Sequence, residues 1–348
     1  MLIELPRLIR SVYGLELAGQ DDAFAAREAA TACSAVERIA PGLATARGID
    51  PDRITGLAYT HAAIDLIAKS EASIEAARVA LELASIDRTG TVAVRARDVR
   101  GSTGVSTAEA ERELGSVLVD RGFDVDLDDP DHELRALFSG GNDAIEGTDA
   151  EREGGSVCLL GWLAVETVRG YGDRRPTDRP FFQPGSMDPL DARAIVNVAG
   201  AGPGTIVVDP MCGTGGLLVE AVLVGGRAIG IDAQPKMVRG TRQNLELLEP
   251  DPPAEVILGD ATALPFRDRS IDAIAFDAPY GRQSKIARHE LADLVGGALT
   301  EARRVAPRGV MVADRSFERA ATAAGWTVEE RFERRVHGSL VRHVHVLR

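Results

Sequence analysis

Two short segments of the chain combine residue types that could carry out group transfer. The first, residues 205–216 (TIVVDPMCGTGG), is a β-branched apolar run that ends in Asp209 and three glycines, with an apolar stretch after it. This order predicts a strand, a tight turn and a helix. Because glycine lacks a Cβ, Gly213 and Gly215 would let a ligand lie against the backbone at the carboxyl end of the strand. We therefore expect a ligand site at this turn.

Acidic residues at the ends of successive strands indicate what kind of ligand binds there. The turn lacks GxGxxG spacing and Asp209 would repel a pyrophosphate, which argues against a nicotinamide or flavin dinucleotide. S-adenosylmethionine instead carries positive charge on its sulfonium and α-amino groups, and Asp209 can accept from the amine. Asp232 ends a second strand about 20 residues after Gly213, the separation at which a carboxylate reaches ribose hydroxyls. Asp260 follows a third strand and suits the exocyclic amine of adenine.

These features together predict S-adenosylmethionine as the cofactor. Its contacts are expected from the glycine turn and from the ends of the second and third strands, with Cys212 as a small apolar loop residue rather than a nucleophile. The cofactor-binding residues that we predict are Asp209, Cys212, Gly213, Gly215, Asp232, Ala233, Asp260 and Ala261.

The second segment is Asp277-Ala278-Pro279-Tyr280, at the carboxyl end of a fourth strand. It resembles the (Asp/Asn/Ser)-x-Pro-aromatic loop of methyltransferases that act on exocyclic amines of nucleobases. Such an amine is a weak nucleophile because its lone pair is delocalised into the ring, so acceptors must hold both of its protons. Asp277 and the carbonyl of Ala278 could supply them, and Pro279 would keep that carbonyl turned inward. Tyr280 would stack on the base once it is flipped out. We predict these four residues as the catalytic group.

The composition limits what the whole chain can be. Its 348 residues suffice for two or three domains, and no apolar run reaches membrane-spanning length or resembles a signal peptide. We therefore expect a soluble, cytoplasmic protein. The three cysteines, Cys33, Cys158 and Cys212, show no CxxC or Cys/His spacing, so neither a disulfide framework nor a metal site is expected.

The charge is unusual for a protein that would handle nucleic acid. A net charge of −13 and a pI near 5.0 should repel phosphate. Lysine occurs only at Lys69, Lys236 and Lys285. An acid-rich, lysine-poor surface suits a protein that stays hydrated in concentrated salt, where the Debye length falls to about 3 Å at 1 M. We therefore predict a halophilic source, in which short-range arginine contacts, stacking and shape recognise RNA.

Arginine-rich segments are the candidate RNA contacts. Residues 169–179 and 331–348 are net positive and interleaved with tyrosine and histidine, although a hinge and an ordinary final strand would explain them equally well. Residues 120–153, by contrast, are strongly acidic, and a solvated loop is the simplest interpretation. The RNA-binding residues that we predict are Arg95, Arg97, Arg174, Arg175, Arg179, Arg334, Arg335, His337 and Arg342.

The chain is predicted to be α/β, with an α+β N-terminal region before a Rossmann-like domain. An amphipathic helix is expected over residues 21–39, and residues 59–165 show strands alternating with a helix at 107–119. The strands expected there are 91–97, 133–138 and 157–163. The predicted domains are an α+β subdomain over 1–58, an RNA-binding domain over 59–165, a linker over 166–184 and a Rossmann-like domain over 185–348.

Two groups of motifs connect the chain to known families. Residues 91–138, with VAVRARDVRG, a helix and GFDVDLDDPDHELRALF, resemble the THUMP domain of RNA-modifying enzymes. RPFFQPGSMDPLDARAIVNVAG, DPMCGTGG, GDA and DAPYG, in that order, resemble the archaeal tRNA guanosine-N2 methyltransferases that modify position 10. The resemblance covers residues 60–348. The family often has histidine at the position of Gln183, and proline is commoner at Ala278; the first difference leaves the role of that turn in cofactor binding open.

The resemblance implies an RNA-binding N-terminal half that measures the tRNA acceptor end and a domain that transfers one or two methyl groups. We therefore predict methylation of the exocyclic N2 amine of a guanosine in tRNA, with position 10 as the expected target. The expected partner is tRNA, with no metal, membrane or obligate protein partner. A methyltransferase for ribosomal RNA or adenine is an alternative, as is a non-catalytic RNA-binding protein, against which the intact acids at 209, 232, 260 and 277 argue.

Overall fold

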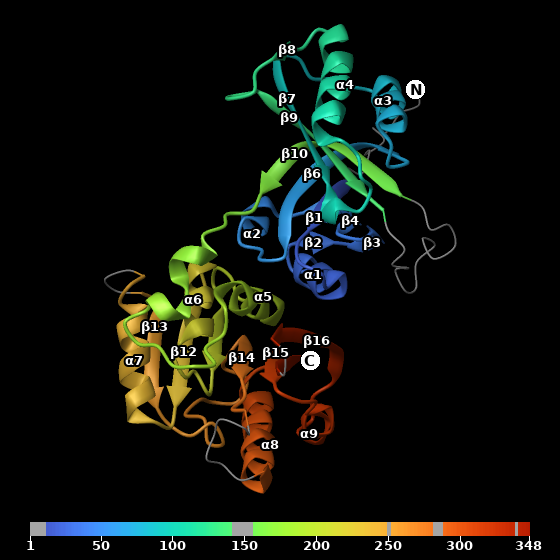
Figure 1. Cartoon of the computed structure of the whole chain (residues 1–348). Coiled ribbons are helices and arrows are strands. Elements are labelled where there is room, and N and C mark those ends of the chain that lie inside the picture. The colour runs from blue at the N-terminus through green and yellow to red at the C-terminus, as the bar shows by residue number, and fades with distance from the viewer. Residues whose placement is uncertain (1–11, 141–155, 249–251, 281–287, 338–339) are drawn as a thin grey trace, which may run out of the picture. The chain divides into compact units, whose positions relative to one another are not determined.

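A computed structural model of the chain describes residues 12–140, 156–248, 252–280, 288–337 and 340–348, and the side chains of residues 288, 289 and 337 lie outside this description. The chain divides into two compact units, Met1–Val168 and Arg169–Arg348. Figure 1 shows the elements of both. Each unit has its own sheet and its own buried core. Within the described residues, no helix is long and apolar enough to cross a membrane.

The first unit is built on an eight-stranded sheet with helices α3 (Ile74–Leu83) and α4 (Thr107–Asp120) packed on one face. Figure 1 shows α4 near β7, with α3 next to α4. The strands, in the order in which they pair, are β3 (Glu37–Ala40), β4 (Leu43–Ala46), β1 (Tyr13–Leu17), β6 (Thr60–Ser70), β10 (Val157–Glu166), β9 (His132–Ser139), β7 (Thr91–Asp98) and β8 (Asp124–Val125). The remaining elements are α1 (Asp22–Ala29), α2 (Pro51–Ile54), the short helix η1 (Val99–Gly101) and the pair β2 (Cys33–Ser34) and β5 (Gly48–Ile49).

The elements expected within residues 59–165 are present as strands β7, β9 and β10 and helix α4. β7 runs parallel to both β8 and β9, so α4 and the segment before β9 connect parallel strands. β1 pairs with β6, and strands from before and after residue 58 therefore share one sheet. The assignment of residues 59–165 to a THUMP domain stays a prediction. Residues 141–155, which include part of the acidic segment 120–153, lie outside the described residues.

The helix expected over residues 21–39 is wrong beyond Ala29. The Asp21 carboxylate caps α1 by accepting from the Phe24 amide at 3.0 Å, and the helix ends at Ala29. The chain then forms β2 and β3, with a positive φ of 49° at Ala35 between them. The pairing of β3 with β4 therefore outweighs the helix propensity of the alanines.

A buried carboxylate joins α1 to the chain just before β6. Glu28 is fully buried, and its two oxygens accept from the backbone amides of Ala58 at 2.8 Å and Tyr59 at 2.7 Å. The ring of Tyr59 also meets Phe24 edge to face, with 5.7 Å between ring centroids. Glu28 thus supplies an acceptor to each of two buried backbone amides.

Replacing Glu28 by alanine should destabilise the first unit by about 2–5 kcal/mol, because two buried amides lose their acceptor. Urea unfolding followed by circular dichroism measures this loss. Glu75→Ala, at an exposed position of α3, is the matched control and should change stability by less than about 0.5 kcal/mol. Equal stabilities of the two variants would contradict the assigned role of Glu28.

The second unit contains a seven-stranded sheet in which β17 runs antiparallel to its two neighbours. In pairing order the strands are β13 (Ala254–Leu258), β12 (Arg227–Asp232), β11 (Ile206–Asp209), β14 (Ala273–Asp277), β15 (Gly309–Ala313), β17 (Leu340–Leu347) and β16 (Val328–His337). The helical elements are η3 (Tyr171–Arg174), η4 (Pro176–Asp178), α5 (Pro189–Ala199), α6 (Gly216–Leu223), α7 (Pro235–Leu245), α8 (Arg288–Val305) and α9 (Glu318–Ala323). The predicted α/β fold with a C-terminal Rossmann-like sheet is confirmed.

The strand order creates the position of the site. From β11 the sheet continues through β12 and β13 on one side and through β14 and β15 on the other. Ligands of open α/β sheets bind at such a switch point, outside the carboxyl ends of the strands. Helix α8 covers the strands there through a buried apolar cluster that includes Leu291, Val295, Leu299, Ile274, Phe276 and Met311.

Candidate active site

Two adjoining pockets lie at the carboxyl ends of the central strands. The glycine-loop pocket is lined by Asp209, residues 211–214 and 183–187, and Gly216. The DAPY pocket, with an open volume of about 990 Å³, is lined by residues 232–234, Asp260, Ala261 and all four residues of the DAPY loop. The pockets share Pro184, Gly185, Met211, Gly213, Met237 and Asp277, and therefore form one continuous cleft.

All the predicted cofactor-binding residues except Gly215 line this cleft. Gly213 has a φ of 53°, and a Cβ there would meet no atom closer than 3.9 Å, so its missing side chain leaves open space on the ligand side. A Cβ at Gly215 would instead lie 2.6 Å from Cγ2 of Thr241 in α7. Gly215 is therefore a packing position that lets the loop approach α7, and its contact with the cofactor stays a prediction.

The glycine loop is held by hydrogen bonds from two neighbouring elements. Asp232 at the end of β12 accepts from the Gly213 amide at 3.1 Å and from the Gln234 amide at 2.8 Å. The Thr241 hydroxyl donates to the Gly213 carbonyl at 2.6 Å. Cys212 donates its amide to the Ile231 carbonyl, and its thiol is buried with a pKa well above the usual value because of that burial. The thiol fills space in the loop and is not activated as a nucleophile.

Asp209 lies on the floor of the cleft and is almost fully buried. Burial raises the pKa of Asp209 well above the usual value, and the nearby carboxylates of Asp277 and Asp232 raise it further. A hydrogen bond from the Met211 amide lowers it. Burial likewise raises the pKa of Asp232. Negative charge is thus concentrated where little water can solvate it, and a cationic ligand group would be stabilised there.

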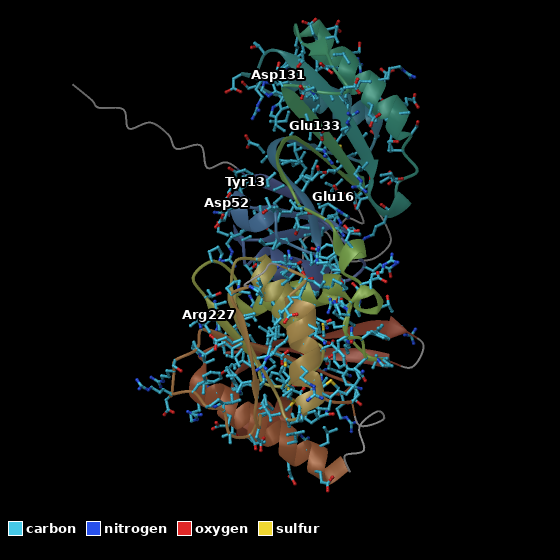
Figure 2. The ribbon with its side chains drawn as sticks, turned by 90° about the vertical axis from the view of Figure 1, so that its left-hand side faces the viewer. Tyr13, Glu16, Asp52, Asp131, Glu133 and Arg227 are labelled. Carbon is cyan, nitrogen blue, oxygen red and sulfur yellow. The ribbon has the colours of Figure 1, made fainter. Side chains whose placement is uncertain are left out.

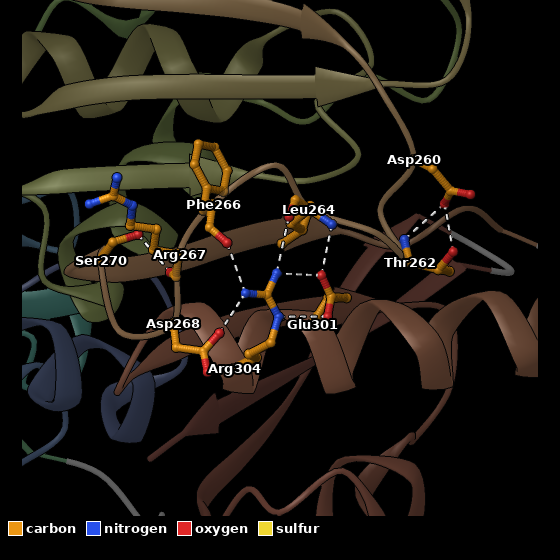
Figure 3. A network of polar contacts seen from close by, with 9 residues as sticks. All are labelled: Asp260, Thr262, Leu264, Phe266, Arg267, Asp268, Ser270, Glu301 and Arg304. Atoms are coloured by element: carbon orange, nitrogen blue, oxygen red, sulfur yellow. Dashed lines mark hydrogen bonds and ion pairs between the residues drawn. The ribbon is translucent and has the colours of Figure 1, made fainter.

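Asp260 begins a loop that α8 fixes in place. Its carboxylate accepts from the amide and the hydroxyl of Thr262, both at 2.8 Å, and these bonds lower its pKa. Further along the loop, Arg304 donates to the carbonyls of Phe266 at 2.8 Å and Leu264 at 3.0 Å (Figure 3). Arg304 also pairs with Glu301 and Asp268, and Glu301 accepts from the Leu264 amide. The loop that carries Asp260 and Ala261 is therefore anchored at several backbone atoms.

The DAPY loop follows β14 directly and closes on its own carboxylate. The Ala278 amide donates to the Val312 carbonyl at 2.8 Å, which ties the loop to β15. The hydroxyl of Tyr280 donates to the two oxygens of Asp277 at 2.8 and 3.0 Å. Tyr280 therefore covers the acceptor atoms that we assign to the substrate amine. For the ring to stack on a base while Asp277 binds the amine, this phenol must first release the carboxylate.

The structure corrects the role predicted for Arg342. Its side chain is only 5% exposed, so it is not available to RNA phosphate. Its Nε donates to the Tyr280 hydroxyl oxygen at 3.0 Å, and its Nη1 lies 3.4 Å from Asp191 of α5. Asp191 also pairs with Arg334 at 3.0 Å, which removes a second predicted RNA contact from the open surface. These residues form a support behind the DAPY loop.

The other predicted RNA contacts of this unit occupy varied positions. Arg174 pairs with the buried Glu220 and lies over the Tyr171 ring, and Arg179 is buried, so both are corrected from surface contacts to internal ones. Arg175 and Arg335 are exposed. The side chain of His337 lies outside the described residues. In the first unit, Arg95 and Arg97 lie two residues apart on β7 and are partly exposed.

Asn244 in α7 is a functional position that the sequence analysis missed. Its buried amide donates to the carbonyls of Phe181 at 2.8 Å and Thr214 at 2.9 Å, and accepts from the Phe181 amide at 3.0 Å. It thereby joins residues 181–187 to the glycine loop. Thr241 lies three residues earlier on the same buried side of α7. Two polar residues at this spacing on an otherwise buried helix face were the available signal.

The sheet order and the acid-ended strands define a Rossmann-like methyltransferase. Residues 176–344 match the family described as RMKL-like, methyltransferase domain. The tRNA (guanine(10)-N2)-dimethyltransferase of Methanothermobacter thermautotrophicus is 34% identical over 260 residues, which are 73% of this chain and 72% of that protein. The enzyme of the same name from Pyrococcus abyssi is 30% identical over 265 residues, 74% of each chain. The chain belongs to the family of archaeal tRNA (guanine(10)-N2)-dimethyltransferases.

Solved structures show likeness over nearly the whole chain. TrmN from Thermus thermophilus is 22% identical, with a TM-score of 0.48, and the match covers 97% of this chain and 99% of that one.

The residues of the cleft fit S-adenosylmethionine, the methyl donor of this class. Buried carboxylates with raised pKa values face the space where its sulfonium and α-amino groups would supply positive charge. Gly213 leaves room for a ligand against the loop backbone. Asp232 and Asp260 both line the DAPY pocket, and their contacts with ribose and adenine stay predictions. Among the described residues, no group of His, Cys, Asp and Glu could hold a metal ion.

Arg342→Gln should move the acidic limb of the pH–rate profile to higher pH. Asp277 must be ionised to accept from an amine; burial raises its pKa to about 6, while Arg342 and the Tyr280 hydroxyl lower it. Wild-type activity should therefore fall as the pH drops through about 6, and removal of Arg342 should raise the midpoint. Initial rates at saturating tRNA between about pH 5 and pH 9 measure this shift.

Arg335→Gln is the matched control, because Arg335 is an exposed arginine on β16. It should leave the midpoint of the profile unchanged. An Arg342→Gln profile with the wild-type midpoint would show that this guanidinium does not act on Asp277.

Proposed function

We propose that this protein transfers methyl groups from S-adenosylmethionine to the exocyclic N2 amine of a guanosine in tRNA, at position 10. The observation that carries the proposal is the position of Asp277. Its carboxylate ends β14 and lines both pockets, so it faces the predicted cofactor side and the substrate side of one cleft. The names of the relatives, tRNA (guanine(10)-N2)-dimethyltransferases, support the choice of base, atom and position.

The cofactor supplies an electrophilic methyl group, and the residues of the chain position the amine that attacks it. Once Tyr280 releases Asp277, the carboxylate can accept one N–H of the amine while the Ala278 carbonyl accepts the other. Holding both protons localises the nitrogen lone pair toward the methyl group, so the N–C bond forms as the S–C bond breaks. Asp277, with its pKa of about 6, can then receive the proton that the methylated amine loses. Catalysis here rests on positioning and on exclusion of water.

Mass spectrometry of nucleosides from an unmodified tRNA transcript, incubated with the enzyme and S-adenosylmethionine, tests the proposal. We expect N2-methylguanosine or N2,N2-dimethylguanosine at position 10. Asp277→Ala should lower the rate at least about 100-fold with nearly unchanged cofactor affinity, because it removes a positioning acceptor. Glu246→Ala, at an exposed position after α7, is the control and should retain wild-type activity. Methylated adenosine as the product, or full activity of Asp277→Ala, would contradict the proposal.

The first unit is the proposed tRNA-binding part, with residues 59–165 as its THUMP domain. The two arginines of β7 contact neighbouring residues but keep part of their side chains exposed. Arg95 donates to the Leu127 carbonyl at 2.6 Å, and Arg97 lies 3.0 Å from the carboxylate of Glu16 on β1 with 49% of its side chain exposed. Figure 2 labels Glu16 and Glu133, the acidic neighbours of these arginines. The predicted halophilic origin and cytoplasmic location stay predictions, and the assays are best run in concentrated KCl.

Removing the Arg97 charge should raise the KM for tRNA severalfold while kcat stays unchanged. Arg97→Gln alone would remove the guanidinium that pairs with the buried Glu16 carboxylate and would destabilise the fold. The test is therefore Arg97→Gln combined with Glu16→Gln. Glu16→Gln alone keeps the cation and is the control. A wild-type KM for the double variant would argue against an RNA contact at Arg97.

A further inference from the structure

Helix α7 carries a positively charged outer face beside the cleft. Lys236, Arg239 and Gln243 are exposed, and their spacing of three and four residues places them on one side of the helix. Among the described residues, neither Lys236 nor Arg239 forms an ion pair with a carboxylate. Arg242 instead donates to the Val256 carbonyl of β13 at 2.6 Å. The charges of Lys236 and Arg239 are therefore available to a ligand from outside the chain.

An exposed aromatic ring adjoins this face. The ring of Phe181 packs against α7, because its centroid lies 5.7 Å from the Lys236 ammonium and a Cβ on Gly240 would stand 2.1 Å from its Cδ1. The side chain of Asn244 bonds both the amide and the carbonyl of Phe181. The next ring, Phe182, is 41% exposed on this anchored backbone. Phe182 can therefore stack on a ligand with little further ordering of the chain.

The ring and the cations flank the cleft from two segments. Phe182 directly precedes Gln183, the first residue of the segment that lines the glycine-loop pocket. Lys236 lies between Gln234 and Met237, which line the DAPY pocket. A ligand that contacts Phe182 and Lys236 would therefore lie next to whatever occupies the cleft.

The chemistry of this surface fits single-stranded RNA. The chain has a net charge of −13, so two exposed cations without an acidic partner form a local exception that favours a polyanion. A ring beside cations is typical of surfaces that bind unpaired nucleotides, because the ring stacks on a base while the cations bind phosphates. An acidic protein segment would match the cations but would not need the ring.

We propose that Phe182, Lys236 and Arg239 bind the RNA strand next to the target guanosine. The ring of Phe182 stacks on the base of a neighbouring nucleotide, and the two cations bind phosphates of the same strand. This inference rests on the proposed function, because it assumes that a guanosine of tRNA enters the cleft. Base flipping breaks the stacking of the target on its neighbours, and the contact with Phe182 offsets part of that cost.

The first test removes the ring. The affinity of the full-length protein for an unmodified tRNA transcript is measured with S-adenosylhomocysteine present. Phe182→Ala should weaken binding by about 5- to 100-fold, the effect of losing one base–aromatic stack. Phe182→Tyr keeps a ring and should bind within about twofold of the wild-type protein. Both variants should keep kcat at saturating tRNA, because neither changes a residue that lines the cleft.

A fluorescence measurement detects the stacking itself. Both native tryptophans, Trp162 and Trp326, are only 3% exposed, so an indole introduced by Phe182→Trp is distinct from them in its access to RNA. The tRNA transcript should quench the introduced indole. Leu223→Trp is the matched control, because Leu223 is 43% exposed at the end of α6 that lies away from the cleft. Its fluorescence should not change when tRNA binds.

The second test removes the cations. In Lys236→Gln combined with Arg239→Gln, the slope of log affinity against log KCl concentration should fall by about 1.5, the effect of losing two phosphate contacts. The control, Arg267→Gln combined with Arg319→Gln, removes two exposed arginines and changes the net charge equally. Arg267 precedes β14, and Arg319 lies on α9, which contacts β16 at the other edge of the sheet from α7. This control should keep the wild-type slope.

The outcomes distinguish this inference from the proposed function. Wild-type tRNA affinity of Phe182→Ala, an introduced indole at this position that tRNA does not quench, or a wild-type salt slope of the double cation variant would each overturn the inference alone. A wild-type protein that neither binds nor methylates the tRNA transcript would overturn the proposed function, and this inference with it.

Discussion

The gathering of three carboxylates in one cleft is the constraint on which the site depends. Asp209, Asp232 and Asp277 follow three neighbouring strands, and burial raises the pKa of each. Hydrogen bonds from the amides of Met211 and Gly213 and from the phenol of Tyr280 offset part of the free-energy cost of burying these carboxylates. The remaining negative charge favours a cationic ligand. The same burial that makes these acids unfavourable in the free protein thus prepares them for a sulfonium and an amine.

Rigid support from distant parts of the second unit keeps these acids in place. The glycine loop is held by α7, the Asp260 loop by α8, and the DAPY loop by Arg342 of β17. Each support is a hydrogen bond to a backbone carbonyl of the loop or, for the DAPY loop, to the hydroxyl of Tyr280. Two of these loops are therefore kept in position by helices and the third by a strand, and chemistry that relies on positioning needs this arrangement.

Local sequence signals predicted the strands and their acidic ends well, because β-branched runs followed by Asp and Gly are determined by neighbouring residues. These local signals were less informative where long-range contacts determine the conformation or the exposure of a residue. The alanines after Ala29 favour a helix, yet Ala30, Ala32 and Ala35 lie in turns or bends, and residues 37–40 pair with β4. Arg342 and Arg179 appear as charged surface residues in the sequence, because no local pattern reveals that Tyr280 or the Arg174 carbonyl lies beside them. Asn244 was missed although its spacing from Thr241 on the buried face of α7 was an available signal.

The most direct test of the account is whether Asp277 holds the exocyclic amine. A tRNA with inosine in place of the target guanosine lacks only that amine. The affinities of both tRNAs are measured for the wild-type protein and for Asp277→Ala, with S-adenosylhomocysteine present. These four affinities form a double-mutant cycle. The account predicts that the wild-type protein binds the guanosine tRNA about tenfold or more tightly than the inosine tRNA, and that Asp277→Ala binds the two alike. An equal preference in both proteins would contradict it.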